Sequence, residues 1–336
     1  IAAFGPSSRA AALEGSKGFM KDLCARAGIA TAAYRRFTDC DEALAWVRAQ
    51  GAPIVVKADG LAAGKGVVIC ESHEAAVRTA HSMLDGAFGA AGATIVVEEF
   101  LQGEEASFIV VAHDQQVIAL ASSQDHKRRD DGDAGPNTGG MGAYSPAPVV
   151  TAAIHARIMR EVIEPTIRGL AADGMPYTGF LYAGVMIAPD GTPNVLEFNC
   201  RFGDPECQPL MARLKSDLLE LMLATCQGRL DQVQVEWDDR AACCVVVAAE
   251  GYPEKPKSGV VIEGLDAAMH VPNVTVYHAG TKRDLDSQIV TAGGRVLGVT
   301  GLGDGLRQAR ERAYEAVGKI RFPGMQYRKD IGAKEL

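Results

Sequence analysis

GFLYAGVMIAPDGTPNVLEFN, residues 179–199, has the pattern of a β-hairpin. An apolar run over 180–187 is followed by Pro, Asp and Gly at 189–191, and apolar residues return at Val195 and Leu196. Turn residues between two apolar runs predict a pair of antiparallel strands. Charged residues follow this hairpin directly in the sequence, which makes it the centre of the predicted site.

The return strand ends in a pair of oxygen-bearing side chains. Glu197 and Asn199 are two positions apart, and on an extended strand such residues point to the same face. A carboxylate beside an amide oxygen suits Mg²⁺ or Mn²⁺. No carboxylate occurs between Gly179 and Ala188, so waters or substrate phosphates would have to complete the metal shell.

The next residues, CRFGDPE, place one cation and two anions in a sharp bend. Arg201, Asp204 and Glu206 are separated by Gly203 and Pro205. Any one of these charges alone would indicate a surface ion pair. Their gathering after a strand with a buried pattern favours a functional site.

Composition limits the possible functions. The chain has 336 residues, which predicts two or three domains. Its formal net charge of −8 argues against nucleic acid or an anionic membrane as the main partner. Eight cysteines without a CxxC spacing indicate reduced, structural thiols. No apolar run approaches the roughly 20 residues of a membrane span, and no signal peptide opens the chain, so we expect a cytoplasmic protein.

The N-terminal residues predict a helix that contains an unusual lysine. IAAFGP, starting at Ile1, has the pattern of a strand end, which predicts a missing N-terminal piece. Residues 7–27 have helical periodicity, with Gly28 as the stop. Lys17 lies between two glycines inside this segment, where the helix breaks or another backbone comes close.

A glycine-rich loop joins two predicted strands, 53–58 and 67–70. The first strand carries Lys57 near its end, and the loop that follows is DGLAAGKG. Backbone N–H groups and an ammonium in such a loop can cover phosphates; the alternative is a glycine hairpin with a solvated lysine. The loop residues concerned are Gly60, Gly64, Lys65 and Gly66.

This loop matches none of three common nucleotide motifs. A P-loop needs four residues between its glycines and a Ser or Thr after the lysine, whereas here there are three residues and a glycine. The dinucleotide fingerprint joins a strand to a helix, and a kinase glycine loop requires HRD and DFG signatures that this chain lacks.

An acidic strand end follows a predicted helix at 74–84. The strand 94–97 runs into EEFL, then a turn at Gly103, and a further strand at 107–111. Backbone at a strand end can bind an adenine edge, and a carboxylate can accept from ribose hydroxyls; an acidic hairpin turn is the alternative. The candidate residues are Glu98, Glu99, Phe100, Leu101 and Glu105.

The segment SSQDHKRRDDGDAGPNTGGMGAYSPAP breaks all periodicity and is expected to be a long loop. A solvated charge run explains its first half, 127–133. The glycine-rich NTGG stretch carries little charge and is typical of a ligand-contacting turn. Its residues are Asn137, Thr138, Gly139 and Gly140.

The remaining periodicity predicts helices and a separate terminal domain. Helices are expected over 151–172 and 208–227. The second carries Arg213, Lys215 and Ser216, which could meet a phosphate, although solvated basic residues on an amphipathic helix are commoner. Short strands from 243 onward, including GVVIEGL at 259–265, and a closing helix at 304–320 predict an α+β domain of roughly 95 residues.

Several of these stretches together resemble a known family. GPSSRAAALEGSK, VVKADGLAAGKGV, VEEFLQGEEASF, NTGGMGAYSPAP, GFLYAGVMI and LEFNCRFGDPECQ resemble the glycinamide ribonucleotide synthetases, the phosphoribosylamine–glycine ligases of the ATP-grasp superfamily. The resemblance covers nearly the whole chain. It implies a ligase of purine biosynthesis that joins glycine to 5-phosphoribosylamine through a glycyl phosphate, with ATP as the phosphoryl donor.

The resemblance also implies a role for each candidate residue. Mg²⁺ or Mn²⁺ on Glu197 and Asn199 would bridge the ATP phosphates, whose charge Lys17, Lys57 and Lys65 would offset. The segment 98–101 would hold adenine, Glu105 the ribose, and 137–140 would close over substrate. Catalytic roles fall to Arg201, Lys57, Lys65 and Asp204, with Arg201 on the transferring phosphoryl group. Asp204 and Glu206 would meet the glycine ammonium or the sugar amine.

The implied fold is mixed α+β and α/β. An ATP-grasp central domain is expected over 1–34 and 102–239, a lid over 35–101, and a C-terminal α+β domain over 240–336. The resemblance implies a further N-terminal substrate-binding domain, which we expect to be missing from these residues. The alternatives are a nucleotide-binding fragment, inactive without that domain, or another ATP-grasp ligase. We expect a monomer with small-molecule substrates.

Overall fold

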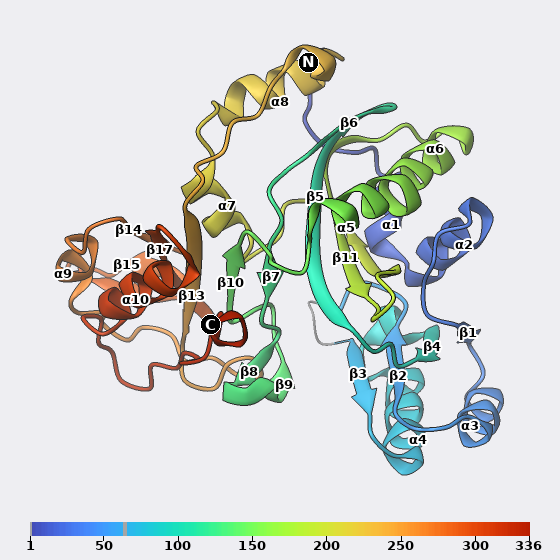
Figure 1. Cartoon of the computed structure of the whole chain (residues 1–336). Helices are drawn as coiled ribbons and strands as arrows, with labels where there is room; N and C mark the ends of the chain where they lie inside the picture. Colours follow the sequence, from blue (N-terminus) through green and yellow to red (C-terminus); the bar gives the residue numbers. More distant parts are fainter. Residues whose placement is uncertain (1, 63–65) are drawn as a thin grey trace. The chain divides into compact units, whose positions relative to one another are not determined.

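The computed structural model describes residues 2–62 and 66–336 (Figure 1). Contacts between residues divide the chain into two compact units. The first contains residues 1–120, 149–202 and 218–233, and the second contains 121–148, 203–217 and 234–336. Each unit has a hydrophobic core of its own.

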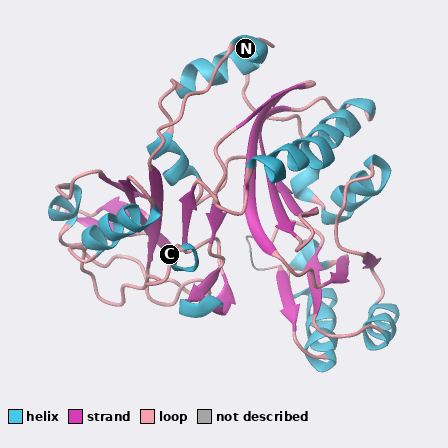
Figure 2. Cartoon of the chain, in the orientation of Figure 1, coloured by secondary structure: helices cyan, strands magenta, loops and turns pink. Residues whose placement is uncertain are grey.

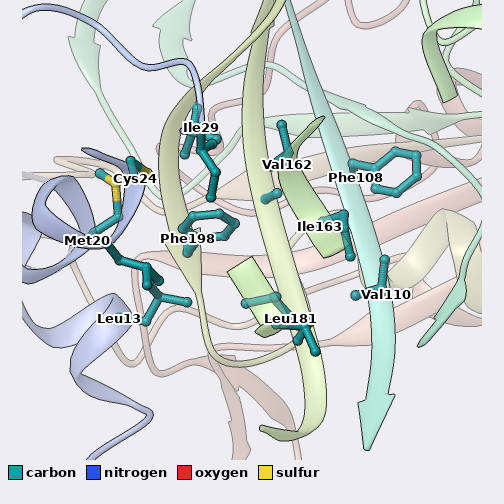
Figure 3. Close-up of a cluster of buried hydrophobic side chains, with 14 of the residues drawn as sticks. Leu13, Met20, Cys24, Ile29, Phe108, Val110, Val162, Ile163, Leu181 and Phe198 are labelled. Atoms are coloured by element: carbon teal, nitrogen blue, oxygen red, sulfur yellow. Dashed lines mark hydrogen bonds between the residues drawn. The ribbon is translucent and has the colours of Figure 1, made fainter. Parts of the chain in front are cut away.

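The main sheet of the first unit contains the hairpin predicted from residues 179–199. Its antiparallel strand order is β12 (Pro193–Asn199), β11 (Thr178–Ile187), β5 (Glu104–His113) and β6 (Gln116–Ala119). Figure 3 shows Phe198 of β12 beside side chains from the N-terminal helices. The helices of this unit outside the lid are α1 (Ala12–Gly15), α2 (Lys17–Ala27), α5 (Ala152–Ile158), α6 (Glu164–Ala172) and α8 (Leu218–Cys226).

A second sheet in this unit is built from residues 34–99, which include most of the segment expected to be the lid. Its antiparallel order is β1 (Tyr34–Phe37), β4 (Ile95–Glu99), β2 (Ile54–Ala58) and β3 (Val67–Cys70). Helices α3 (Cys40–Ala49) and α4 (His73–Ser82) pack beside it (Figure 2). All five residues of β2 are buried, as expected for a strand with neighbours on both sides.

The second unit is built on a sheet that brings distant segments together. Its antiparallel order is β14 (Val274–His278), β17 (Arg295–Gly303), β13 (Ala241–Ala248), β10 (Gly142–Ser145) and β7 (Gln124–Asp125). The smaller pairs are β8 (Arg128–Asp130) with β9 (Ala134–Asn137), and β15 (Thr281–Arg283) with β16 (Ile289–Thr291). The helices are α7 (Cys207–Arg213), α9 (Leu265–Met269) and α10 (Leu306–Val317).

Three sequence predictions of secondary structure are wrong. The segment 121–148 is not a loop, because β10 pairs with β13 about a hundred residues later, a contact that local periodicity cannot reveal. The helix over 208–227 is broken, since Leu214 is extended and the buried Arg213 donates to the carbonyls of Asp238 and Arg240. The expected strand at 259–265 makes isolated bridges only.

The helix expected over 7–27 is interrupted at Ser16, which is extended and caps α2 by accepting from Phe19 N–H. Gly28 ends α2 in the left-handed conformation, as predicted. The compact units group 121–148 and 203–217 with the C-terminal residues, whereas the expected boundaries place them within 102–239. The expected three-part division stays a prediction. Among the described residues no helix is long and apolar enough to cross a bilayer.

Candidate nucleotide and metal site

The strand β12 carries a β-bulge at Leu196. Val195 pairs with Val185 and Glu197 with Gly184, so Leu196 is the extra residue. The bulge shifts the alternation of side chains, because Val195 and Phe198 are both buried although they are three positions apart. As a result Glu197 and Asn199 stay partly exposed beyond the core.

The bulge also leaves a backbone carbonyl for the lid. The Leu196 carbonyl accepts a hydrogen bond from Nζ of Lys57 at 3.3 Å. Opposite, a side chain on Gly184 would bring its Cβ to 3.3 Å from Cγ of Glu197, so glycine leaves this carboxylate room. The end of β2 is therefore joined directly to the strand that carries the metal candidates.

Glu197 and Asn199 fit a hard divalent ion through the chemistry of their donors. One carboxylate and one amide oxygen are the ligand types that Mg²⁺ and Mn²⁺ take. In the described part of the chain, no three or more His, Cys, Asp or Glu residues gather as a metal site. Glu197 and Asn199 would supply two of the oxygens around such an ion.

A buried carboxylate on the second sheet pairs with two lysines. Glu98, in β4, is 2% exposed and forms ion pairs with both Lys57 and Lys21. Lys21, in α2, is fully buried and also donates to Oγ1 of Thr31 at 2.9 Å and to the Ala32 carbonyl at 3.1 Å. Burial lowers the pKa of Lys21, while Glu98 opposes that shift. Two ammonium groups on one carboxylate leave a net positive charge.

Lys17 adds to this positive charge. Its Nζ lies 3.4 Å from the Gly60 carbonyl. Burial lowers the pKa of Lys17; Glu197 opposes the shift and Lys57 adds to it. The pKa of Lys17 thus responds to both Glu197 and Lys57. That these residues form one nucleotide site stays a prediction.

Asp59 ties the glycine-rich loop to the start of α2. Its carboxylate accepts from Oγ of Ser16 at 2.9 Å and from the Gly18 N–H at 2.6 Å, and its carbonyl accepts from Lys17 N–H. A Cβ on Gly18 would lie 2.8 Å from Nη1 of Arg36. The atoms nearest to Gly18 belong to the side chains of Arg36 and Asp59, whereas the sequence predicted that another backbone would come close.

The glycine-rich loop is described only in part. Gly64 and Lys65 lie outside the described residues. The Gly66 carbonyl accepts from Ala58 N–H at 2.8 Å, and a Cβ on Gly66 would lie 2.5 Å from Cβ of Ala62. A side chain at Gly60 would also collide, with Cα of Ala91 at 2.8 Å.

The predicted adenine-binding segment divides into two parts. The side chain of Glu98 faces the two lysines. The N–H of Glu99 donates to the Ala33 carbonyl, and the Glu99 carboxylate accepts from the Ala33 N–H. Phe100 is 37% exposed, and no hydrogen bond to the backbone of Phe100 or Leu101 is found within residues 2–62 and 66–336. Glu105 lies half-buried on β5, opposite Met186.

Arg201 follows β12 and interacts with the metal candidates. Its Nη2 donates to Oδ1 of Asn199 at 3.1 Å, and its Nε lies 3.4 Å from Oε1 of Glu14. The other oxygen of Glu14 accepts from Cys200 N–H at 2.8 Å. Glu14 and Lys21 were missed from the sequence, because nothing in a helical pattern marks which charge is turned inward.

The remaining predicted residues belong to the second unit. Oγ1 of Thr138 donates to the Lys127 carbonyl at 2.9 Å and accepts from Gly140 N–H at 3.0 Å, which shapes the turn after Asn137. Glu206, before α7, is 3% exposed. Lys215 and Ser216 lie in the break between α7 and α8, where the Ser216 hydroxyl bonds to a neighbouring backbone segment. Asp204 is held by Gln208 and Arg295.

Comparison with known proteins assigns the family. Residues 15–207 match the ATP-grasp (A) domain of phosphoribosylglycinamide synthetase, and residues 242–334 match its C domain. This chain belongs to the phosphoribosylglycinamide synthetase family. The resemblance noted in the sequence and the ATP-grasp fold are therefore confirmed.

Relatives and solved structures agree with this family. The chain is 58% identical over 334 residues to the phosphoribosylamine–glycine ligase of Vibrio vulnificus, covering 99% of this chain and 77% of the relative. It is 57% identical over 334 residues to the ligase of Escherichia coli O157:H7, covering 99% of this chain and 78% of that relative. The crystal structure of the ligase from Thermotoga maritima superimposes with a TM-score of 0.88 at 35% identity, covering 98% of this chain and 81% of that one.

A more distant structure shares the fold. The biotin carboxylase domain of the Hydrogenobacter thermophilus 2-oxoglutarate carboxylase, crystallised with MgADP and bicarbonate, superimposes with a TM-score of 0.74 at 20% identity. The superposition covers 97% of this chain and 70% of the carboxylase chain. At this identity the likeness shows the fold alone.

Proposed function

We propose that this chain ligates glycine to 5-phosphoribosylamine at the expense of ATP, giving glycinamide ribonucleotide, ADP and phosphate. The observation that carries the assignment to this site is the positive charge of two buried lysines on one buried carboxylate. Lys21 and Lys57 share the single carboxylate of Glu98, and the pKa of Lys17 responds to Glu197 and Lys57. A polyphosphate would balance that charge.

Each group in this cluster has a chemical task in phosphoryl transfer. Glu197 and Asn199 would hold Mg²⁺ or Mn²⁺, and that ion would neutralise charge on the β- and γ-phosphates when bound. Lys57 and Lys17 would offset the remaining phosphate charge. Phe100 and Leu101 would offer backbone groups to the adenine edge, and Glu105 would accept from the ribose hydroxyls.

The reaction then takes two steps. A carboxylate oxygen of glycine attacks the γ-phosphorus, and the bond to ADP breaks to give glycyl phosphate. The amine of phosphoribosylamine next attacks the acyl carbon, phosphate leaves, and the nitrogen loses a proton. Arg201 would stabilise the phosphoryl group during transfer, because its planar guanidinium matches phosphate oxygens. We propose that the enzyme acts in the cytoplasm as a monomer.

ADP release tests this assignment. With ATP and Mg²⁺, release should require both glycine and phosphoribosylamine, and omission of either should abolish it. The alternative, a nucleotide-binding fragment, predicts binding of MgADP without any ligation. Substrate-independent ATP hydrolysis at the full rate would contradict the ligase assignment.

Arg201→Ala tests the role of the arginine. We expect a loss in kcat of at least about 100-fold with ATP affinity nearly unchanged, because the contact would form in the transition state. Arg160→Ala is the matched control, since that side chain is 64% exposed and pairs only with Glu161 among the described residues. Equal losses of turnover and ATP affinity would contradict the proposed role.

A further inference from the structure

Arg295 joins two segments of the second unit that the sequence singled out separately. It is the first residue of β17, and its guanidinium donates to the carbonyl of Gly139, to the carbonyl of Asp204 at 2.7 Å and to Oδ2 of Asp204 at 2.8 Å. Gly139 belongs to the NTGG turn and Asp204 to the RFGDPE bend. Nothing within either motif predicts this partner, which follows them by 156 and 91 positions.

The backbone of Gly139 is held on both sides of its Cα atom. Its N–H donates to the Tyr252 hydroxyl at 2.9 Å, while its carbonyl accepts from Arg295. A Cβ on Gly139 would lie 3.0 Å from Cζ of Arg295, and one on Gly294 would lie 2.4 Å from Cδ2 of Tyr252. Glycine at 294 is therefore needed for this close approach, and a side chain at 139 would press directly on the guanidinium of Arg295.

The carboxylate of Asp204 is likewise fixed by two donors. Oδ2 accepts from Arg295, and Oδ1 accepts from Nε2 of Gln208 at 2.9 Å. Its side chain nevertheless remains half exposed. Each carboxylate oxygen has a second lone-pair direction, so Asp204 can still accept from an ammonium or amine.

The chemistry of the guanidinium explains why an arginine is used. Three acceptors from two segments require a planar fork with several fixed donors, whereas an ammonium is a point charge on a flexible stem. We propose that Arg295 is a positioning residue for the amine-bearing substrates of the ligase. It sets the spacing between the 138–140 turn and the Asp204 carboxylate, which together receive those substrates. This inference rests on the proposed function.

Kinetics of Arg295→Ala and Arg295→Lys in the full chain test the proposal. With Arg295→Ala, kcat/KM for glycine or phosphoribosylamine should fall about 100-fold, since misplacement by about 1 Å costs that much. KM for ATP should change less than about threefold. Arg295→Lys should recover no more than about a tenth of the lost activity. Arg283→Ala, an exposed arginine on β15, is the matched control and should match wild type.

Hydrogen exchange provides a readout that does not depend on catalysis. In Arg295→Ala, peptides covering 137–142 should exchange faster, while peptides from β11 and β12 keep the wild-type rate. Unchanged exchange over 137–142, full rescue by lysine, or a parallel rise in KM for ATP would each overturn the proposal. If the wild-type chain shows no ligation, the proposed function fails, and the exchange result alone decides whether Arg295 holds the turn.

Discussion

Replacing Lys21 with methionine removes one of the two cations on a buried carboxylate. Lys21 is fully buried and contributes an ion pair to Glu98 and hydrogen bonds to Thr31 and Ala32. Methionine has a similar length and no charge, so it fills the space without replacing these contacts. The Thr31 hydroxyl keeps a partner, because it also donates to the Val195 carbonyl at 2.6 Å.

The expected loss of stability follows from the groups left behind. One oxygen of Glu98 and the carbonyl of Ala32 lose a donor, and each such buried acceptor costs about 1–3 kcal/mol. The sum of about 4 kcal/mol is partly offset, because methionine avoids burying an ammonium. We expect the free energy of unfolding of the first unit to fall by about 3 kcal/mol.

Urea unfolding followed by Trp46 fluorescence measures this loss. Trp46 packs on Phe37 in the lid, and Trp237→Phe in both proteins removes the signal of the second unit. Glu98→Gln is the informative comparison, since it leaves two ammonium groups without a counter-charge and should cost more than Lys21→Met. Wild-type stability in Lys21→Met, or a smaller loss in Glu98→Gln, would refute the reasoning.

Three further predictions concern other parts of the chain. Gly140→Ala should destabilise the second unit by more than about 3 kcal/mol, because φ is +108° and the new Cβ would lie 2.3 Å from Pro205. Gly132→Ala, where φ is also positive and the space is open, should cost only about 1 kcal/mol; equal urea midpoints would contradict this. Burial lowers the pKa of His126 from 6.5 to about 4, so the fold should lose about 3 kcal/mol as the pH falls from 6.5 to 4. His126→Gln should remove that dependence. If the urea midpoints of the variant differ between pH 7 and pH 4.5 as much as those of the wild type, His126 is not the source of the pH dependence. Glu197→Gln should raise the Mg²⁺ concentration needed for half-maximal activity at least about tenfold, and an unaltered Mg²⁺ titration would count against a metal at this position.

Local sequence patterns predicted elements whose residues are contiguous, and they failed where a strand depends on a distant partner. The hairpin of β11 and β12 was predicted because its turn and strands are contiguous, and the pairing of Val195 with Val185 confirms it. The strand β10 was missed because its partner, β13, is far away in the sequence. A four-residue strand gains stability mainly from that partner, so its own residues carry little signal.

The candidate site shows the same dependence on local and distant contacts. Residue types and spacing singled out Lys57, Glu197 and Asn199, all of which lie in the first unit. Lys21 and Arg295 could not be found in this way. Both act through contacts with distant segments, and an isolated lysine in a helix or arginine in a strand has the pattern of a solvated residue.

A crystal structure of the chain with a non-hydrolysable ATP analogue and Mg²⁺ tests the central claim most directly. The account predicts a metal ion on the carboxylate of Glu197 and the amide oxygen of Asn199, bound to the polyphosphate, with Nζ of Lys57 within hydrogen-bond distance of a phosphate oxygen. A bound nucleotide with Glu197 and Asn199 turned away from its phosphates, or with Lys57 out of reach of them, would contradict it.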